Sequence, residues 1–374
     1  MKLIRTFHPV GQGAFYSERH FLRGGEFTVV YDCGSSTMRT IDLEKKIKST
    51  FPKNNQIDIL FISHFHADHI NGIEALKQHC VIKKVIIPLL DDEARTLYKV
   101  ANFVENLNHD IQQIDNQLID NPEGFFGNET IVIKVRPTEI NPNEGLNELS
   151  NPIDINTIRS PVVIPSGTVF VPQINVDWVF IPYNYEHKFR LTQFENALLI
   201  SKLTLKDIDT IENINNHRAA IVNAYKAIDG DLNKNSMILF SGREHDNKFR
   251  IFQHSSFNFN RDYPNPRFNE KSQSGCLYMG DIDLNEPSII DDISGKLKPV
   301  LSCIGTIQVP HHGSIHNFES SILKKINCSY GIVSYGTKNN YGHPSDRVLG
   351  DIIQNRVAPF HVTENQNSIL VQYD

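Results

Sequence analysis

Four side chains that can bind metal ions fall within six residues, at His64, His66, Asp68 and His69. Imidazole nitrogens and carboxylate oxygens suit zinc, and also manganese or iron. The cluster follows the apolar run 57–62, which is typical of a buried strand, and loops at strand ends are held in place by a rigid sheet. We expect His64 and His66, two residues apart in an extended turn, to bind one ion. Asp68 and His69 begin the next helix and are expected to bind a second ion nearby.

Two later segments place further candidate ligands after predicted strands. Asp281 follows the strand predicted at 276–279, and a carboxylate at that point can bridge two metal ions. His311 and His312 follow the strand predicted at 303–309. One of them can complete the second metal site, while the other faces the substrate phosphate or the leaving group. We favour His311 as the ligand and assign His312 to catalysis, with the reverse assignment left open.

Two more residues receive roles outside the set of ligands. His343 lies in a turn at 340–345, where it can protonate a leaving oxygen or hold a phosphate. Asp32 ends the strand predicted at 27–31 and is expected to orient a ligating histidine rather than to bind metal.

The composition narrows the class of protein. A chain of 374 residues with 40% hydrophobic residues is long enough for one large α/β domain with insertions or for two small domains. No apolar run approaches the roughly 20 residues that span a bilayer, and the early charges of the N-terminus argue against a signal peptide. Five scattered cysteines without a C-x-x-C pair indicate reduced thiols in a cytoplasmic protein. The net charge of −6 argues against a strongly basic nucleic-acid coat, although it leaves room for a local basic groove.

Between the motifs, the pattern predicts strands that alternate with helices and several insertions. A helical stripe covers 91–117, segments 119–128 and 136–160 are predicted to be loops, and 191–228 is predicted as a two-helix insertion. The segment 255–273 is rich in turn residues, aromatics and arginines. It suits either a lid that stacks on bases or a plain surface loop, and the surface loop is favoured.

The stretch from His64 to His69 resembles the His-x-His-x-Asp-His signature of the metallo-β-lactamase superfamily. Shorter motifs are similar to those of one branch, the hydrolase domain of the DNA-uptake channel protein ComEC, over about 1–90, 161–182, 230–242 and 275–374. In chain order these motifs are Val10-Gly11-Gln12-Gly13, Tyr31-Asp32-Cys33-Gly34, Ser63 to His69, Asn233-Lys234-Asn235-Ser236, Gly280-Asp281, Pro310-His311-His312-Gly313-Ser314 and Asn339-x-Tyr341-Gly342-His343-Pro344.

This resemblance implies an αββα sandwich formed by one domain, 1–374, with insertions at about 91–160, 186–230 and 243–273. It also implies a binuclear metal centre whose bridging hydroxide attacks the substrate. Two departures matter. The membrane-spanning parts of ComEC are absent, so transport is not implied. Many superfamily members supply a third histidine to the first metal where this chain reads 233–236 without one, so the first site is expected to be weaker or completed by water.

Three functions remain open at this point. The leading hypothesis is a cytoplasmic, metal-dependent phosphodiesterase, a nuclease, that uses two zinc or manganese ions and Asp68, His343 and His312 as catalytic residues. Its expected partners are a nucleic acid or nucleotide substrate, no membrane, and a protein that docks on the insertions. The second hypothesis is hydrolysis of a small phosphodiester or another ester: a cyclic nucleotide, a phosphorylcholine ester, a lactone or a lactam. The third is a non-catalytic module that binds metal.

Overall fold

The computed structural model describes most of the chain. The described residues are 2–106, 116–141, 143, 145–174, 176–185, 189–228, 236–244, 248–249, 252–253, 272–326 and 328–373. The loop predicted at 255–273 falls almost wholly outside them, as do residues 107–115 of the helical stripe predicted at 91–117.

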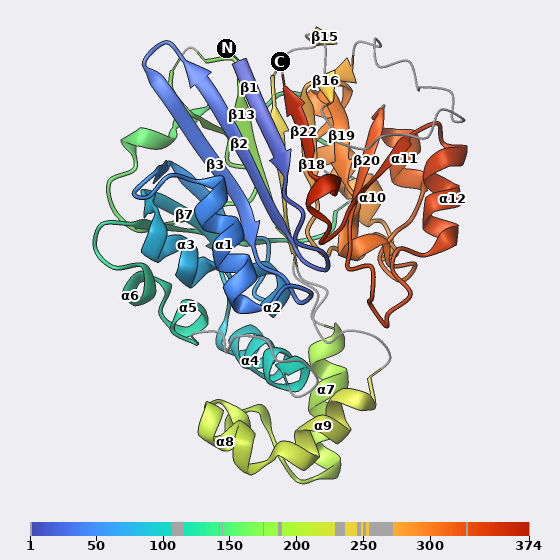
Figure 1. Ribbon diagram of the computed structural model, residues 1–374. Helices are drawn as coiled ribbons and strands as arrows, with labels where there is room; N and C mark the ends of the chain where they lie inside the picture. The colour runs from blue at the N-terminus through green and yellow to red at the C-terminus, as the bar shows by residue number, and fades with distance from the viewer. Residues whose placement is uncertain are drawn as a thin grey trace.

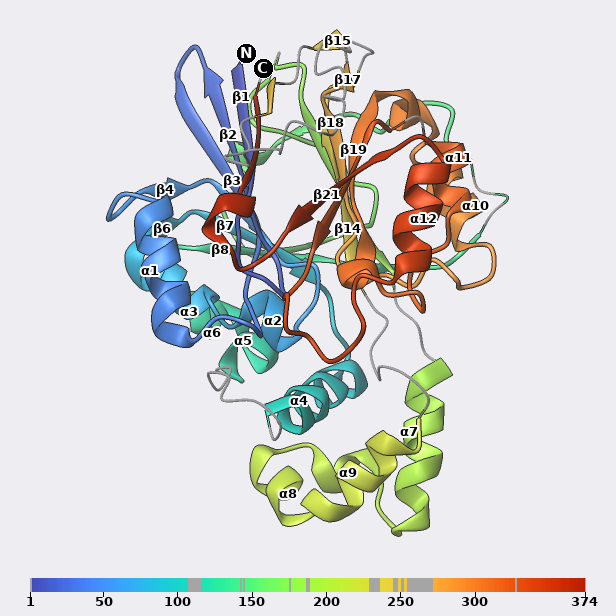
Figure 2. The same cartoon turned by 45° about the vertical axis from the view of Figure 1, so that its right-hand side comes forward.

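Two β-sheets of nine strands each lie face to face at the centre of the molecule (Figures 1 and 2). The first sheet contains, in spatial order, β11 (Val162–Ile164), β8 (Ile131–Val135), β7 (Lys84–Pro88), β5 (Ile59–Phe61), β3 (Gly25–Cys33), β2 (Phe15–Leu22), β1 (Lys2–Phe7), β22 (Leu370–Tyr373) and β16 (Phe252–Gln253). The second contains β10 (Ile153–Asp154), β12 (Phe170–Val171), β13 (Val179–Tyr185), β14 (Ser236–Gly242), β18 (Gly275–Tyr278), β19 (Ile304–Gln308), β20 (Tyr330–Ser334) and β21 (Ala358–Val362), with β9 (Pro137–Thr138) beside β13. Two further pairs are β4 (Gln56–Ile57) with β6 (Val81–Ile82) and β15 (Lys248–Phe249) with β17 (Ser272–Gln273).

Helices cover the outer face of each sheet. The first sheet carries α1 (Thr40–Thr50), α2 (Ala67–Ile70), α3 (Ile73–His79), α5 (Gln117–Asp120) and α6 (Pro122–Phe126). The second carries α10 (Ile289–Lys296), α11 (Ser321–Lys325) and α12 (Asp346–Gln354). Short 3₁₀ turns occur at η1 (Ile155–Thr157), η2 (Leu205–Ile208), η3 (Lys298–Cys303), η4 (Pro310–Gly313) and η5 (Gln366–Ser368).

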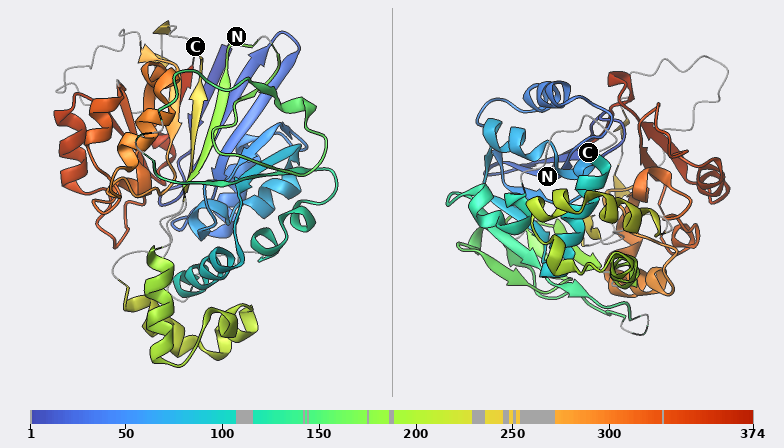
Figure 3. Two further views of the ribbon diagram at one scale, coloured as in Figure 1. Left: turned by 180° about the vertical axis from the view of Figure 1, so that it is seen from behind. Right: turned by 90° about the horizontal axis from the view of Figure 1, so that it is seen from below.

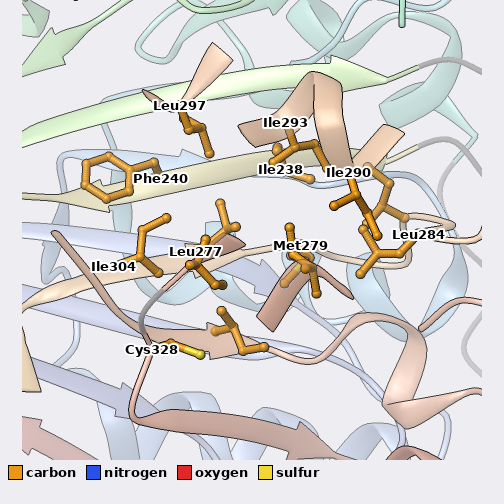
Figure 4. Packing of buried hydrophobic residues seen from close by; sticks show 14 of the residues in the cluster. Ile238, Phe240, Leu277, Met279, Leu284, Ile290, Ile293, Leu297, Ile304 and Cys328 are labelled. Carbon is orange, nitrogen blue, oxygen red and sulfur yellow. The ribbon is translucent and has the colours of Figure 1, made fainter. Parts of the chain in front are cut away.

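Separate apolar cores hold the layers together, since each sheet must bury both faces. One core lies between the sheets and includes Tyr31, Phe61 and Phe180. Another lies between the second sheet and α10, where Ile238, Leu277 and Met279 meet Ile290, Ile293 and Leu297, among others (Figure 4). A third lies under α1 and α3. The predicted αββα sandwich with helical additions is therefore confirmed.

A fourth apolar cluster belongs to helices beyond the sandwich. Here α4 (Asp92–Asn106) packs against α7 (Phe189–Ile200), α8 (Ile211–Asn216) and α9 (Arg218–Lys226). These helices lie beneath the end of the sandwich that carries α2, and the view from behind shows the same arrangement (Figures 1 and 3). The prediction of two helices in 191–228 is wrong in number, because Asp and Asn breaks divide the segment into three α-helices and a 3₁₀ turn.

Two other local predictions need correction. Segment 119–128 is not a loop, because the Asn121 side chain accepts a hydrogen bond from the Gly124 amide and Pro122 opens a helical turn, α6. The helix that Asp68 and His69 were expected to begin starts at Ala67 and is interrupted at Gly72, where a Cβ atom would lie 2.8 Å from the Cys33 carbonyl oxygen. The division of the chain into one domain with three insertions stays a prediction.

Two further observations concern the helices and the cysteines. Among the described residues, no helix has the length and apolar character that crossing a bilayer requires. All five cysteines are buried, and none of them forms a disulfide bond.

A charged pair is buried inside the sandwich. Arg5 is 1% exposed, and its Nε donates to Glu18 Oε1 at 2.7 Å. Its remaining nitrogens donate to the Ser274 and Ser241 carbonyl oxygens and to Gln372 Oε1, so the guanidinium connects β1 with strands of the second sheet. Burial alone would raise the pKa of the Glu18 carboxyl, but Arg5 and His20 hold it below its ordinary value.

We predict that Glu18→Ala lowers the free energy of unfolding by about 3–5 kcal/mol, because the Arg5 cation would be left buried without a partner. Urea denaturation followed by circular dichroism measures this loss. The control is Arg19→Ala, next to Glu18 on β2, which removes the ion pair between Arg19 and Glu26 of β3. The Arg19 side chain is 46% exposed, so this change should cost less than about 1 kcal/mol. Equal losses in the two variants would contradict the prediction.

Candidate metal centre

The candidate ligands meet where the ends of the two sheets touch. His64 and His66 follow β5 of the first sheet, and Asp281 follows β18 of the second. The two sheets are joined at this point by a hydrogen bond of 2.8 Å from the Met237 amide, in β14, to the Ser63 carbonyl oxygen. This contact brings side chains more than 200 residues apart in the chain into one centre.

The ligand atoms form two groups, and within each group they lie within 4.8 Å of one another. The members are His64, His66 and Asp281 in the first group and Asp68, His69 and His312 in the second. Asp281 lies between the groups, since its Oδ2 is 3.6 Å from His64 Nε2 and its Oδ1 is 3.2 Å from His69 Nε2. Its carboxylate therefore faces both.

The outer nitrogen of each ring is held by the protein. His64 Nδ1 lies 2.9 Å from Ser63 Oγ, and His312 Nδ1 lies 2.8 Å from the Ser334 carbonyl oxygen. Histidines that bind metal are typically fixed in this way through the nitrogen that faces away from the ion. The arrangement leaves the Nε2 atoms directed into the centre.

Asp32 fixes the third ring and the loop around it. Its Oδ2 lies 2.8 Å from His69 Nδ1, and the Ser63 amide and hydroxyl donate to its two oxygens at 2.7 and 2.6 Å. Asp32 is fully buried and has a positive φ of 54°. The structure thus places Asp32 behind His69, the geometry that the orienting role predicted from the sequence requires.

Unused buried atoms provide a test of whether these residues fit metal ions. The Nε2 atoms of His64 and His69 and Oδ1 of Asp281 are buried and make no hydrogen bond with any described residue. A buried polar atom without a partner is costly, and so is a buried carboxylate without a cation. Divalent ions would satisfy both, so the donor set fits metal ions.

The electrostatics of the centre lead to the same conclusion. Burial would raise the pKa of the Asp281 carboxyl, but the nearby imidazoles of His69, His311 and His64 lower it far below its usual range. Burial likewise would lower the pKa of His69, but the carboxylates of Asp281, Asp68 and Asp32 raise it well above normal. The centre therefore favours positive charge at the point where the carboxylates converge.

The two consecutive histidines point in different directions. His311 and His312 have φ values of 45° and 57°, a left-handed conformation that is costly for residues other than glycine and is common at functional sites. As a result, His312 Nε2 lies 3.0 Å from Asp68 Oδ2, whereas His311 Nδ1 lies 2.8 Å from Asn317 Oδ1.

This geometry differs from the preferred assignment of the pair. The sequence favoured His311 as the second-site ligand, but the structure groups His312 with Asp68 and His69. His311 Nε2 lies 3.9 Å from Asp281 Oδ2, beside the first group. The left-handed backbone at both positions turns the later histidine back toward α2, and neighbouring letters in a sequence carry no sign of such a turn.

His343 lies at the rim of the centre. Its ring centroid is 5.4 Å from that of His311 and 6.4 Å from that of His312. Asn339 holds the loop, because its Nδ2 donates to the His343 carbonyl oxygen at 2.6 Å and its Oδ1 accepts from the His343 amide at 3.0 Å. The partly exposed ring of His343 stacks on Tyr341, whose side chain is largely exposed. A substrate that enters the centre from solvent would meet His343.

Ser236 occupies the region where many superfamily members carry a further histidine. Residues 233–235 lie outside the described part of the chain, but the Ser236 hydroxyl accepts a hydrogen bond of 3.2 Å from the Asp281 amide. Gly280, with a φ of 53°, approaches Ser236 so closely that a Cβ atom would collide with the hydroxyl. Ser236 therefore positions Asp281.

Two residues that the sequence did not single out support the ligand loop from α4. Asn102 is 4% exposed and donates to the Phe65 carbonyl oxygen at 2.8 Å. The Tyr98 ring lies 5.5 Å from Phe65 and 5.7 Å from His66, centroid to centroid. The sequence signal that could have identified Tyr98 and Asn102 is their spacing of four residues on the helix predicted at 91–117, on a face other than its apolar stripe.

Comparison with known proteins agrees with the fold. A family model described as the metallo-beta-lactamase superfamily matches residues 20–143, the part that carries the histidine cluster. The matched segment makes up about a third of the 374 residues, and over this part the chain is similar to the metallo-β-lactamase superfamily. Members are generally hydrolytic metalloenzymes that bind divalent metal ions, typically zinc. No curated protein matches the chain in sequence.

Three solved structures are remotely similar. The metallo-β-lactamase fold protein YhfI from Bacillus subtilis is 8% identical, with 100% of both chains covered and a TM-score of 0.38. Zn²⁺-bound PqqB from Methylobacterium extorquens is 8% identical, with 97% of this chain and 98% of that chain covered and a TM-score of 0.41. MEM-A1, a subclass B3 metallo-β-lactamase isolated from a soil metagenome library, is 9% identical, with 85% and 80% covered and a TM-score of 0.30. The narrower resemblance to the ComEC hydrolase domain stays a prediction.

We predict that Asn102→Ala weakens zinc binding about tenfold, because the loop between His64 and His66 loses its support from α4. Competition with a chromophoric chelator measures the zinc affinity, and the visible spectrum of the cobalt-substituted protein reports the ligand geometry. Asn223→Ala, an exposed asparagine on α9, is the matched control. An unchanged affinity and cobalt spectrum in Asn102→Ala would rule out this supporting role.

Proposed function

We propose that this protein is a metal-dependent phosphodiesterase that cleaves nucleic acid with the help of two zinc or manganese ions. The observation that carries the proposal is the pair of adjacent ligand groups joined through Asp281. Two-ion centres of this kind suit phosphodiester cleavage, in which an attacking and a leaving oxygen both need stabilisation. His64, His66 and Asp281 would hold one ion, and Asp68, His69 and His312 would hold the other.

The ions would supply a bound water of lowered pKa and positive charge to offset that of the phosphate. The protein residues do the rest. Asp281 and the three Nε2 atoms of His64, His69 and His312 are fixed from behind, which keeps the centre rigid when the substrate arrives. Asp68 is 15% exposed, so its carboxylate can accept a hydrogen bond from the attacking water and orient it.

The histidines at the rim of the centre suit interactions with the leaving oxygen and with the phosphate. His343 lies beside His311 and His312 in the partly exposed loop next to the centre. A protonated imidazole there can donate to the leaving oxygen as the phosphodiester bond breaks. His311, held by Asn317, can donate to a non-bridging phosphate oxygen.

We predict that Asp68→Ala lowers the rate of phosphodiester cleavage at least about a thousandfold, because the variant lacks both a ligand and the group that orients water. The measurement is cleavage of end-labelled single- and double-stranded DNA with added zinc or manganese, and the product lengths separate exonuclease from endonuclease action. Asp92→Ala, whose side chain is 97% exposed, is the control. Rates in Asp68→Ala close to those of the native protein would refute the mechanism.

The same assay separates the alternatives. Hydrolysis of bis(4-nitrophenyl) phosphate without cleavage of DNA would support a small phosphodiester as substrate. Tight metal binding without hydrolysis of any ester would support a module that binds metal without catalysis.

We predict a dependence on the leaving group for His343→Ala. Because 4-nitrophenolate leaves without being protonated, the variant should lose less than about threefold in kcat on bis(4-nitrophenyl) phosphate, but about a hundredfold on DNA. His316→Ala, which changes an exposed histidine four residues after His312, is the control. Equal losses on both substrates would assign His343 to phosphate binding instead of proton donation.

A further inference from the structure

A surface cleft of about 590 Å³ lies between α1 and η5, and none of the candidate metal ligands lines it. Its charged and polar lining includes Arg39, Lys45, Lys46, Asp42, Glu364 and Gln366. Three cations and two carboxylates give the cleft a positive balance in a chain whose overall charge is −6.

Both carboxylates of the cleft already have partners. Asp42 lies 2.7 Å from Arg39 Nε and 3.6 Å from Lys45 Nζ. Glu364 accepts hydrogen bonds from the amide and the hydroxyl of Thr337. Neither is an ion-pair partner of the remaining cation.

That cation is Lys46, and its environment is unusual for a lysine. The ammonium is partly buried and donates to Gln366 Oε1, a neutral amide. Among the described residues, no carboxylate lies within ion-pair distance of it. Burial lowers the pKa of Lys46, the direction expected of a cation that is partly desolvated without a counter-charge. An anionic group in the cleft would restore that balance.

The cleft lies next to the metal centre, separated from it by one tight turn. The Gln12 amide donates to Thr37 Oγ1 at 2.9 Å on the side of the cleft, and the Ala14 amide donates to the Asp68 carbonyl oxygen at 3.2 Å on the side of the centre. The chain step from Gln12 to Ala14 and these two hydrogen bonds together span a distance on the order of 10–15 Å between Thr37 in the cleft and Asp68 in the centre. A few nucleotides of a single strand cover this distance.

We propose that the cleft binds a phosphate of a single nucleic-acid strand while another phosphodiester of the same strand lies at the metal centre. The assignment rests on the proposed function, which it extends by naming an extended polyanion as the substrate. Lys46 is its main contact, with Arg39 and Lys45 adding positive charge at the mouth. The cleft thereby provides a local basic groove, which is compatible with the negative net charge of the chain as a whole.

The test is the affinity for a fluorescently labelled single strand of 12 nucleotides, measured by anisotropy in the full-length Asp68→Ala background at several salt concentrations. Adding Lys46→Ala should raise Kd about fivefold at low salt. It should also reduce the slope of log Kd against log salt by about 0.7, the value for one phosphate contact of a single strand. The matched control is Lys48→Ala, a lysine of the same helix that pairs with Glu44 and does not line the cleft.

Two further measurements distinguish the loss of the Lys46 charge, and the need for a strand long enough to reach the cleft, from a general disturbance of the fold. Lys46→Arg keeps the charge and should keep Kd close to that of the parent, which a fold-damaging substitution would not. A labelled dinucleotide cannot reach both the centre and the cleft, so its Kd should be the same with and without Lys46→Ala.

The proposal is overturned if the 12-nucleotide strand does not bind, if Lys46→Ala and Lys48→Ala give equal Kd values and slopes, or if the dinucleotide is weakened as much as the longer strand. Failure of the proposed function has a different signature. In that case the native protein cleaves no strand, while the difference between Lys46→Ala and Lys48→Ala in binding persists.

Discussion

Three carboxylates that are largely shielded from water converge on one imidazole, and this electrostatic constraint dominates the structure. Asp32, Asp68 and Asp281 all lie close enough to His69 to raise its pKa. Buried negative charge of this kind is tolerated when positive charge compensates it. Cations at the centre would provide that compensation, and the alignment of the two sheets brings the carboxylates and imidazoles together there.

A second buried polar cluster shows what a purely structural solution looks like. Both carboxylate oxygens of Glu18 accept hydrogen bonds, from Arg5, Tyr278, His20 and Ser241, so the charge is fully satisfied inside the sandwich. The metal centre differs because its inward-facing atoms are left without such bonds. The same fold thus contains one polar cluster that stabilises it and one that is prepared for ligands.

The parts outside the sandwich adjoin the centre on two sides. On one side α4 contacts the ligand loop through Tyr98 and Asn102 and packs against α7–α9 with its opposite face. On the other side, the turn around Gln12 separates Asp68 from the cleft that contains Lys46. The helices outside the sandwich are therefore in contact with the loop that carries the candidate metal ligands.

The sequence by itself determined the features that depend on local spacing. An apolar run followed by His64, His66, Asp68 and His69 specifies a strand, a turn and the start of a helix, and strand–helix alternation specifies the layered α/β class. These properties depend on residues close together in the chain, so periodicity and ligand spacing in the sequence are enough to predict them. The positions of Asp281 and the other strand-end residues were found because the carboxyl ends of strands are favoured places for sites.

The tertiary structure alone decided the features that depend on contacts between distant segments. The choice of His312 over His311 beside Asp68 follows from two left-handed residues in succession, which no local preference for histidine predicts. The contacts of Asn102 and the surroundings of Lys46 depend on how α4 and η5 pack against other elements. Such packing is set by the burial of whole layers rather than by neighbours in the chain, so it became visible only once the sheets and helices were in place.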